Sequence, residues 1–308
     1  MDPDPRHHRL TGMMTALVTP FLHGQVHGAA LSALVCSQIE AGIDGIVAGG
    51  TTGEASSFLG NERNAVIGLC VEAANGRVPV IAGTGTNSTK DTIEFTSAAQ
   101  ALGADAALIV TPYYNRPSQE GVFQHFQAIA RAVEIPIILY NVPSRTNIDL
   151  NLDTLERLAE FPNIIGIKDA TGDLSRPMAL ASRLGDRFIQ LSGHDATAMA
   201  FNMMGGQGTI SAVANIVPNL CVDLQKAWLR GDAKAAMAIQ QRLQPLIAAL
   251  ELESYPGPVK HALHVLHGAS AEMRLPLVPV SRATAHAIEA AVASLYLCGG
   301  YAEADLTY

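Results

Sequence analysis

The sequence predicts a closed (β/α)8 barrel, the TIM-barrel fold, followed by additional helices. Two observations support this prediction: short apolar runs recur at a fairly even interval, and segments with apolar residues at helical spacing separate them. The runs are continuously apolar, which is typical of strands that are covered on both faces in a parallel sheet. Strict alternation of strand and helix indicates right-handed βαβ units, and eight such units favour a closed barrel over an open doubly wound sheet.

Eight apolar runs are predicted to form the strands. In chain order they are MTALVTPF near Thr15, GIVAGG near Ile46, VPVIAGTG near Val80, AALIVTPYY near Leu108, PIILYNVP near Ile138, NIIGIKDA near Ile165, FIQLSG near Ile189 and GTISAV near Ile210. Helical spacing is clearest at Leu31, Leu34, Val35 and Ile39, at Phe123, Phe126, Ile129 and Ala130, and at Leu152, Leu155 and Leu158. A Rossmann-like sheet is less well supported, because FLHGQVHG after the first run is not the GxGxxG turn of that fold.

The residues after the eighth run read as helices that are additional to the barrel. Their segments are LCVDLQKAWLRGD, AAMAIQQRLQPLIAALEL, PVKHALHVLHG and RATAHAIEAAVASLYL. No Ser/Gly-rich linker or run of charge precedes them, so we expect a packed appendage rather than an independently folding domain. The predicted organisation is a catalytic barrel over residues 12–215, a helical appendage over 216–298, and terminal tails at 1–11 and 299–308.

The composition is that of a globular protein and excludes several classes. Of the 308 residues, 48% are hydrophobic and 16% are charged, so the chain can bury a large core and is neither disordered nor a disulfide scaffold. The formal net charge is −8 and Lys and Arg do not cluster, which argues against a nucleic-acid partner. No signal peptide or membrane-spanning run is recognised. Cys36, Cys70, Cys221 and Cys298 lie among apolar neighbours without a CxxC pair, so we expect core thiols in a cytoplasmic protein.

The residues that close the apolar runs are the candidates for chemistry, because the active site of such a barrel lies at the carboxyl ends of its strands. Most are hydroxyl-bearing residues or glycines: Thr19, Gly50, Thr51, Thr52, Gly83, Thr84, Thr111, Tyr113, Tyr114, Tyr140, Asn141, Lys168, Ser192, Gly193 and Ser211. Of the five lysines in the chain, Lys168 alone ends an apolar strand. Low-dielectric walls disfavour its ammonium form and favour a nucleophilic amine. The alternative is a structural lysine that pairs with Asp169 or Asp173.

Two further features lie near this strand end. Tyr140 closes the preceding strand, so its phenol can lie beside the Lys168 amine and transfer protons, or it can be a packing aromatic. The turn GGTTGE after the second strand offers two hydroxyls and backbone N–H groups, which suit a small carboxylate.

Other chemistries lack the residues that they need. The motifs GxxxxGK[ST], HExxH and GxSxG are absent from the sequence. His261, His264 and His267 share a helix of the appendage and are interpreted as a solvated or satisfied face. The GGQG segment at 205–208 fits either a phosphate site or backbone crowding before a strand.

Five motifs, in this order, resemble the dihydrodipicolinate synthase family of the N-acetylneuraminate lyase superfamily. They are GGTTGEASSF, TPYYNRPSQEGVFQHF, ILYNVPSRT, NIIGIKDATGD and LSGHDATA, and the similarity extends from about Gly12 to RLPLVPVS near Pro279. The resemblance implies a Schiff-base lyase that condenses pyruvate with L-aspartate 4-semialdehyde to 4-hydroxy-tetrahydrodipicolinate, in lysine and diaminopimelate biosynthesis.

The resemblance also implies catalytic roles. Lys168 would form an imine with pyruvate, and Tyr140 would shuttle protons through Thr51. Tyr114 would reach across a dimer interface to complete this relay in the neighbouring subunit, so a homodimer or homotetramer is expected. No metal or organic cofactor is implied, because the lysine imine is itself the electron sink.

Four more residues are expected to contact substrate. Thr52, with Thr51, would hold the pyruvate carboxylate, and Arg145 would bind the carboxylate of the semialdehyde as a two-pronged donor. Gly193 and Ile210 complete the substrate-binding residues that the resemblance implies.

Two departures from the family keep an alternative open. Asn147 stands where the family nearly always has Gly, and His194 replaces the acidic residue that usually follows SG. Asn tolerates a left-handed backbone, so the turn can survive. The alternative is a pyruvate-dependent aldolase of a 2-keto-3-deoxy sugar acid or a related hydratase-aldolase, although Arg145 favours the synthase. A non-catalytic keto-acid sensor is a third reading, against which the intact lysine, tyrosines and threonines argue.

The resemblance also bears on feedback inhibition by L-lysine, which sensitive relatives bind at the dimer interface. The matching positions that keep polar partners are Asn87, Asp91 and Tyr113, whereas Ala55, Gly60 and Arg63 depart from the usual residues. An inward Arg63 would repel the incoming ammonium. The sequence therefore predicts weak or absent inhibition by lysine.

Overall fold

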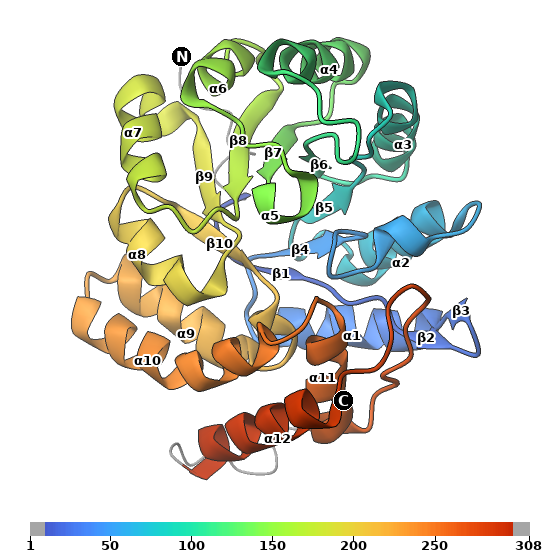
Figure 1. Cartoon of the computed structure of the whole chain (residues 1–308), viewed down its shortest axis with the longest axis vertical. Coiled ribbons are helices and arrows are strands. Elements are labelled where there is room, and N and C mark those ends of the chain that lie inside the picture. Colours follow the sequence, from blue (N-terminus) through green and yellow to red (C-terminus); the bar gives the residue numbers. More distant parts are fainter. Residues whose placement is uncertain (1–9, 298–308) are drawn as a thin grey trace.

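The structure is a computed structural model that describes residues 10–297, and its centre is a closed barrel of eight parallel strands (Figure 1). The strands neighbour one another in the order β1, β10, β9, β8, β7, β6, β5, β4, and β4 pairs with β1. They are β1 (Gly12–Ala16), β4 (Gly45–Ala48), β5 (Val80–Gly83), β6 (Ala106–Val110), β7 (Ile137–Asn141), β8 (Ile164–Asp169), β9 (Ile189–Ser192) and β10 (Gly208–Ser211). Seven of the eight predicted runs contain their strands, and β1 begins two residues before the first run, so the barrel fold is confirmed.

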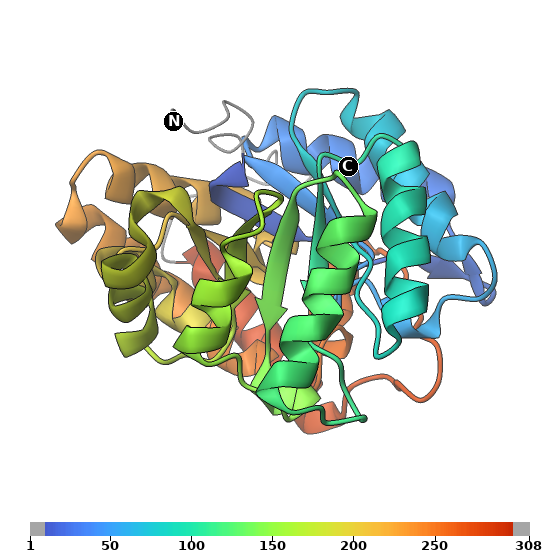
Figure 2. The same cartoon turned by 90° about the horizontal axis from the view of Figure 1, so that it is seen from above.

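Helices follow the strands and surround the barrel (Figure 2). They are α1 (Gly28–Glu40), α2 (Glu62–Ala74), α3 (Thr89–Ala101), α4 (Gln119–Ala132), α6 (Leu152–Leu158), α7 (Ser175–Leu184), α8 (Ala198–Met203) and α9 (Pro218–Leu229), with a short α5 (Pro143–Thr146) after β7. Side chains of Ser88, Ser118 and Asn151 accept hydrogen bonds at the starts of α3, α4 and α6, and each satisfies an otherwise unpaired N–H group. The three segments with the clearest helical spacing are α1, α4 and α6, as predicted.

Helix α9 differs from the prediction, because it belongs to the barrel rather than to the appendage. It follows β10, contacts β1 and α8, and buries Leu220, Cys221 and Leu224 in the core. The side chain of Asn202 in α8 donates a hydrogen bond to Gln225 of α9 at 3.1 Å. Helical periodicity does not distinguish a helix that covers the last strand from one outside the ring. The predicted boundary at residue 215 therefore separates the barrel from its own last helix.

Three helices form the additional C-terminal layer. They are α10 (Ala233–Leu250), α11 (Gly257–His267) and α12 (Arg282–Leu297). Helix α10 packs on α9 and α12, and α11 packs on α12, at the lower edge of the view in Figure 1. Cys298 and the predicted tails, apart from Leu10 and Thr11, lie outside the described residues.

A small antiparallel hairpin was not predicted. Strands β2 (Phe21–Leu22) and β3 (Gln25–Val26) are joined by His23 and Gly24, both with positive φ, at 52° and 75°. Two positive φ values in a two-residue loop are those of a type I′ turn, for which glycine is favoured. Two-residue strands are too short to show an alternating pattern, so no sequence pattern predicted this hairpin.

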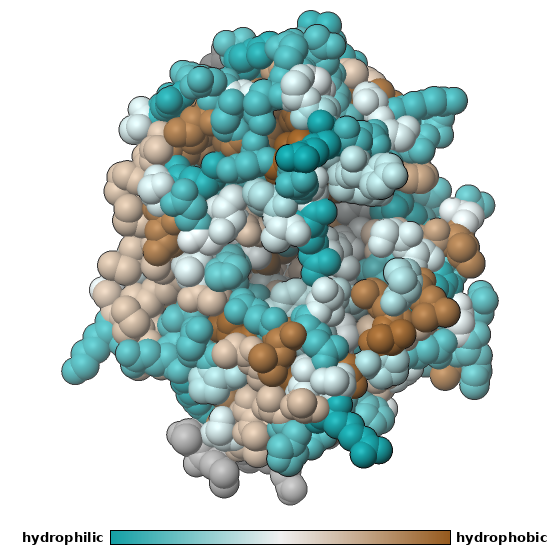
Figure 3. Space-filling view, viewed as in Figure 1, coloured by the Kyte–Doolittle hydropathy of each residue, from teal (hydrophilic) through white to brown (hydrophobic). Residues whose placement is uncertain are grey.

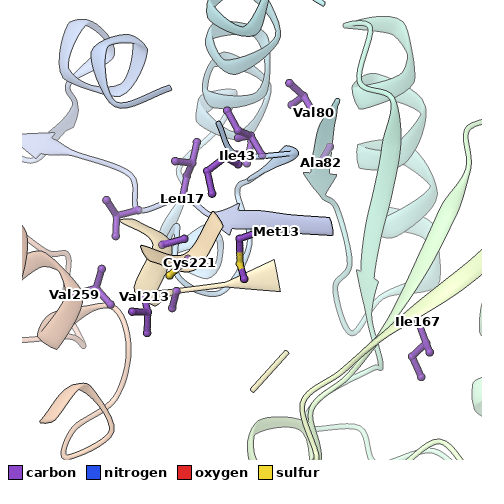
Figure 4. Close-up of a cluster of buried hydrophobic side chains, with 14 of the residues drawn as sticks. Met13, Leu17, Ile43, Val80, Ala82, Ile167, Val213, Cys221 and Val259 are labelled. Carbon is purple, nitrogen blue, oxygen red and sulfur yellow. The ribbon is translucent and has the colours of Figure 1, made fainter. Parts of the chain in front are cut away.

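Two apolar clusters hold the fold together. One fills the barrel and includes Met14, Val47, Ile81, Leu108 and Ile138. The other lies between the barrel and its helices, and Figure 4 shows part of it, with side chains from β1, β5, β8, α9 and α11. Strands β1 and β4 to β8 each supply residues to both clusters, so their sequences are apolar at successive positions.

The buried thiols behave as core residues. Cys70 and Cys221 lie in the cluster outside the barrel, and burial raises the pKa of the Cys70 thiol to about 12 and that of Cys221 as well. Within residues 10–297, no helix is long and apolar enough to cross a membrane.

Candidate active site

A pocket of about 60 Å³ lies at the carboxyl ends of the barrel strands. The strands run toward the face that is viewed in Figure 1, and Figure 3 shows polar and intermediate side chains around the centre of that face. The residues that line the pocket are Ala16, Thr51, Thr52, Tyr140, Arg145, Lys168, Gly193, His194, Asp195, Ile210, Ala212, Glu251 and Tyr255. Seven of the eight predicted site residues are among them, and Tyr114 is the exception.

Lys168 and Tyr140 are brought together by strand register. They are direct partners across β8 and β7, and each is 7% exposed. The Nζ atom of Lys168 lies 4.4 Å from the centroid of the Tyr140 ring. The carboxylates that a structural lysine would use are engaged elsewhere, because Asp169 pairs with Arg176 at 2.8 Å and Asp173 accepts hydrogen bonds from Ser175. The structure therefore places a buried amine next to the Tyr140 ring, while both neighbouring acids are bonded to other residues.

Gly193 provides room for the lysine side chain. A Cβ atom at this position would lie 2.8 Å from Cε and 3.1 Å from Cγ of Lys168, and 2.9 Å from Cβ of Ala170. The N–H group of Gly193 donates to the carbonyl of Asp169 at 2.6 Å. This close approach explains why a glycine follows β9 at the pocket wall.

The turn that carries Thr51 and Thr52 follows β4. Its backbone is closed by hydrogen bonds from the N–H groups of Gly53 and Glu54 to the carbonyls of Gly50 and Thr51, both at 3.1 Å. The hydroxyl of Thr19, after β1, donates to the carbonyl of Gly53 at 2.7 Å. Thr52 is buried and Thr51 is half-buried, so both hydroxyls are held at the pocket by a turn with little freedom.

A buried ion pair fixes this turn to the C-terminal layer. Lys260 of α11 donates to the Glu54 carboxylate at 2.5 Å, and these side chains are 1% and 0% exposed. Lys260 Nζ also donates to the carbonyl of Glu272 at 2.7 Å, and Glu54 accepts the N–H of Arg274 at 3.2 Å. Burial lowers the pKa of Lys260, and the nearby Glu54 opposes this effect. Lys260 lies near the start of the predicted helix PVKHALHVLHG, but its partner lies 206 residues away and no local pattern pointed to it.

Asp195 is a pocket residue that the sequence analysis did not single out. Its carboxylate accepts the N–H groups of Ala212 and Val213 at 3.1 and 3.5 Å. Burial raises the pKa of Asp195, while hydrogen bonds from Ser211 and these N–H groups, and the charge of Lys168, oppose the rise. Its position two residues after Gly193, just past a strand end, is a signal that could have identified it.

Glu251 and Tyr255 are two further pocket residues that were missed, and both come from the connection between α10 and α11. Burial raises the pKa of the Tyr255 phenol, the negative charges of Asp195 and Glu251 add to the rise, and Arg145 opposes it. No sequence spacing shows that a connection so far along the chain returns to the barrel mouth.

Arg145 and Asn147 lie on and after the short helix α5. Arg145 is exposed and lines the pocket, as expected for a residue at the entrance. Asn147 has φ 56°, and its N–H group caps α5 by donating to the carbonyl of Pro143 at 2.9 Å. The left-handed backbone that was expected at this departure from the family is therefore present at Asn147. Its side chain is exposed, and asparagine is one of the residues that tolerate this conformation.

Tyr114 lies outside the pocket of its own chain. It is 93% exposed, on the loop between β6 and α4, and its φ is 68°. A left-handed backbone is uncommon for a bulky aromatic residue and carries strain. The phenol of Tyr114 therefore points outward from its own chain. Its role in the pocket of a neighbouring subunit stays a prediction.

The other motifs fit structural interpretations. Cβ atoms at Gly206 and Gly208 would lie 2.3 Å from the Phe201 ring and 2.2 Å from the Gly12 carbonyl oxygen, so crowding explains these glycines. The Nδ1 atom of His264 lies within hydrogen-bond distance of the carbonyl oxygen of Ala269, at 2.9 Å. The Nε2 atom of His261 lies 3.5 Å from Oε1 of Glu289. Within the described residues, no cluster of His, Cys, Asp and Glu is arranged to hold a metal ion.

Comparison with known proteins agrees with this geometry. Residues 9–295 match the model of the dihydrodipicolinate synthetase family. The 4-hydroxy-tetrahydrodipicolinate synthases of Rhodospirillum centenum and Parvibaculum lavamentivorans are 49% and 50% identical, over 91% and 92% of this chain and 97% of each relative. The crystal structure of the chloride-inhibited dihydrodipicolinate synthase from Acinetobacter baumannii complexed with pyruvate is 46% identical, with a TM-score of 0.90 over 92% of this chain and 98% of that one. The chain therefore belongs to the dihydrodipicolinate synthetase family.

Proposed function

We propose that this protein is a pyruvate-dependent carbon–carbon lyase that condenses pyruvate with L-aspartate 4-semialdehyde to 4-hydroxy-tetrahydrodipicolinate, as a step of lysine and diaminopimelate biosynthesis. The observation that carries the proposal is the buried Lys168 amine beside Tyr140, in a pocket that has Arg145 at its mouth. The amine supplies a nucleophile for a keto acid, and the guanidinium supplies a receptor for a second carboxylate.

In the proposed reaction, the Lys168 amine attacks C2 of pyruvate and water leaves to give an imine. Loss of a methyl proton yields an enamine, and its carbon attacks the aldehyde carbon of the second substrate. The α-amine of that substrate then attacks C2 and displaces Lys168, which closes the ring and regenerates the enzyme. Tyr140 and Thr51 carry the protons, and Thr51 and Thr52 hold the pyruvate carboxylate. The imine is the electron sink, so this route requires no metal or organic cofactor.

Two measurements test the proposal. Borohydride added with pyruvate is expected to trap a covalent adduct on Lys168, detectable by mass spectrometry, and an unmodified Lys168 would exclude the whole class of reaction. A rate comparison between aspartate semialdehyde and sugar-derived aldehydes then identifies the second substrate. Preference for a sugar-derived aldehyde would favour the sugar-acid aldolase, for which Asn147 and His194 are the motivating residues.

Gly193→Ala is expected to lower kcat/KM for pyruvate roughly 10- to 100-fold, because the added methyl group displaces the Lys168 side chain and small errors in the position of a reacting group are costly. The rate of adduct formation is expected to fall in parallel. Gly68→Ala in α2 is the matched control, since its nearest new neighbour would lie at 3.8 Å. Equal activity of the two variants would contradict the role given to Gly193.

The role proposed for Tyr114 in a neighbouring subunit requires that the active unit is at least a dimer. We expect Tyr114→Phe to lower kcat roughly 100-fold, because a proton-transfer group is lost. Hybrid dimers formed with a Lys168→Met variant are expected to regain activity, since one site then combines an intact lysine with an intact phenol. Hybrid dimers with no more activity than the two separate variants would refute the shared site. A monomer that is fully active and sediments as a single chain would refute it as well.

Weak inhibition by L-lysine is expected from the position of Arg63. Its guanidinium is buried and donates to the carbonyl oxygens of Gly83 and Ala55 at 2.6 and 3.0 Å. The Cζ atom of this guanidinium lies 4.7 Å from the centroid of the Phe95 ring. The cation therefore points inward, which is the arrangement that repels an ammonium group. Initial rates with increasing L-lysine at neutral pH check this, and half-inhibition at a sub-millimolar concentration would show it to be wrong.

The proposed location is the cytoplasm. Cys70 and Cys221 are buried free thiols, which suits a reducing compartment. A subcellular fractionation with activity measured in each fraction tests this location.

A further inference from the structure

We propose that Glu251, oriented by His194, binds the α-ammonium group of the second substrate, opposite the Arg145 guanidinium that takes its carboxylate. This inference rests on the proposed function, because among the candidate second substrates only the amino-acid aldehyde carries both a carboxylate and an ammonium group. It makes Glu251 a specificity-determining residue of the pocket mouth.

Glu251 and His194 form a pair from distant parts of the chain. Glu251 is the C-terminal cap of α10, and its Oε1 atom lies 3.6 Å from Nε2 of His194. The other ring nitrogen of His194 lies 3.0 Å from the Thr197 hydroxyl, and its backbone N–H donates to the Ser192 hydroxyl at 3.2 Å. The imidazole is therefore held by its own loop, with its Nε2 atom next to the Glu251 carboxylate at the pocket wall.

The two acids of the pocket differ in what they can offer a substrate. Asp195 is half-buried, and its carboxylate already accepts backbone N–H groups of the turn after β10. The side chain of Glu251 is 41% exposed, and that of His194 is 36% exposed. Glu251 is therefore the carboxylate that an entering ammonium group meets, at a modest cost in lost hydration.

Arg145 and Glu251 bring opposite charges close to one pocket group. Both line the pocket, Arg145 from α5 and Glu251 from the end of α10. The phenol of Tyr255 is within electrostatic range of both, since Glu251 raises its pKa and Arg145 lowers it. A cation and an anion that flank one opening match a ligand that carries a carboxylate and an ammonium group on the same carbon atom.

This arrangement also accounts for His194 as a departure from the family. The resemblance leads us to expect an acidic side chain directly after Gly193, and the sequence has His194 there. In the fold, a carboxylate reaches the same part of the pocket from α10 and lies against that histidine. The substrate ammonium group must later give up a proton, for which Glu251 is the carboxylate in contact, and attack C2 of the imine as an amine. A carboxylate that binds this nitrogen at the pocket mouth therefore also sets its direction of approach.

The test compares two ligands that differ in one group. Succinic semialdehyde has the carboxylate and aldehyde of aspartate semialdehyde but no ammonium, so it can occupy the site but cannot close the ring. For Glu251→Gln we expect the KM for aspartate semialdehyde to rise roughly 10-fold, with an unchanged KM for pyruvate and an unchanged inhibition constant for succinic semialdehyde. Glu253→Gln is the matched control, because Glu253 accepts the N–H of Ser281 and does not line the pocket.

Arg145→Ala provides the opposite pattern, since it is expected to weaken both aldehydes to a similar degree. Glu251→Gln effects that are equal for the two aldehydes, or absent for both, overturn the role of Glu251 while the wild-type rate still supports the proposed function. If the wild-type protein does not turn over aspartate semialdehyde with pyruvate, the proposed function and this inference both fail. Thermal midpoints of all variants show whether a change arises from unfolding.

Discussion

Lys168→Met is expected to abolish condensation while leaving the fold intact or slightly more stable. The amine is the atom that bonds to pyruvate in the proposed reaction, so kcat is expected to fall by about 1000-fold or more and no borohydride adduct to form. The side chain is 7% exposed, and Asp169 and Asp173 are engaged with Arg176 and Ser175. Methionine fills a similar volume without a charge that must be kept in a poorly solvated site.

The two readouts separate a catalytic lysine from a structural one. Removing a lysine that held the fold through an ion pair would lower the thermal midpoint, whereas removing a buried reactive amine leaves the midpoint unchanged or raises it by the equivalent of about 1 kcal/mol. Activity is measured by pyruvate-dependent loss of the aldehyde, and stability by thermal unfolding without substrate. If Lys168→Met still turned over substrate and still formed the same borohydride adduct as the wild type, the assignment would be contradicted. An inactive variant with a lowered thermal midpoint would also contradict it.

The sequence predicted the barrel and most of its pocket because both depend on local patterns. Parallel strands that are covered on both faces are apolar at most positions, so they are visible as runs. The pocket of such a barrel lies where the strands end, so Lys168, Tyr140 and Gly193 could be identified from their place in the runs. Strand register then brings Lys168 and Tyr140 together, as the order of β7 and β8 suggested.

The missed features depend on contacts between distant segments. Glu251 and Tyr255 reach the pocket from the layer that follows the barrel, and Lys260 meets Glu54 across 206 residues. Helix α9 was assigned to that layer, because its periodicity is the same on either side of the barrel boundary. In each case the helical pattern is correct and the packing partner is what the sequence leaves undetermined.

The C-terminal layer therefore lines the candidate active site, and Lys260 is the residue through which the dependence of the pocket on this layer is best tested. Its ammonium lies over the Phe21 ring at 4.5 Å and pairs with Glu54, three residues after Thr51. The same carboxylate accepts the N–H of Arg274, whose guanidinium binds Glu62 at the start of α2. The turn that carries Thr51 and Thr52 is thus anchored by a network that the barrel strands alone do not provide.

Lys260→Met is expected to lower the free energy of unfolding by about 3–5 kcal/mol, because it leaves the Glu54 carboxylate buried without its cation. The double variant Lys260→Met with Glu54→Gln is expected to recover part of this loss, with a coupling of about 1–3 kcal/mol, since no unpaired charge remains and the amide can still accept the N–H of Arg274. The loss is measured by equilibrium unfolding in urea. A rise in the KM for pyruvate is expected in Lys260→Met at temperatures where the variant is folded, because the turn that carries Thr51 and Thr52 loses its anchor. A single variant as stable as the wild type, or a double variant that loses the sum of the two single effects, would show that the pair does not hold the turn.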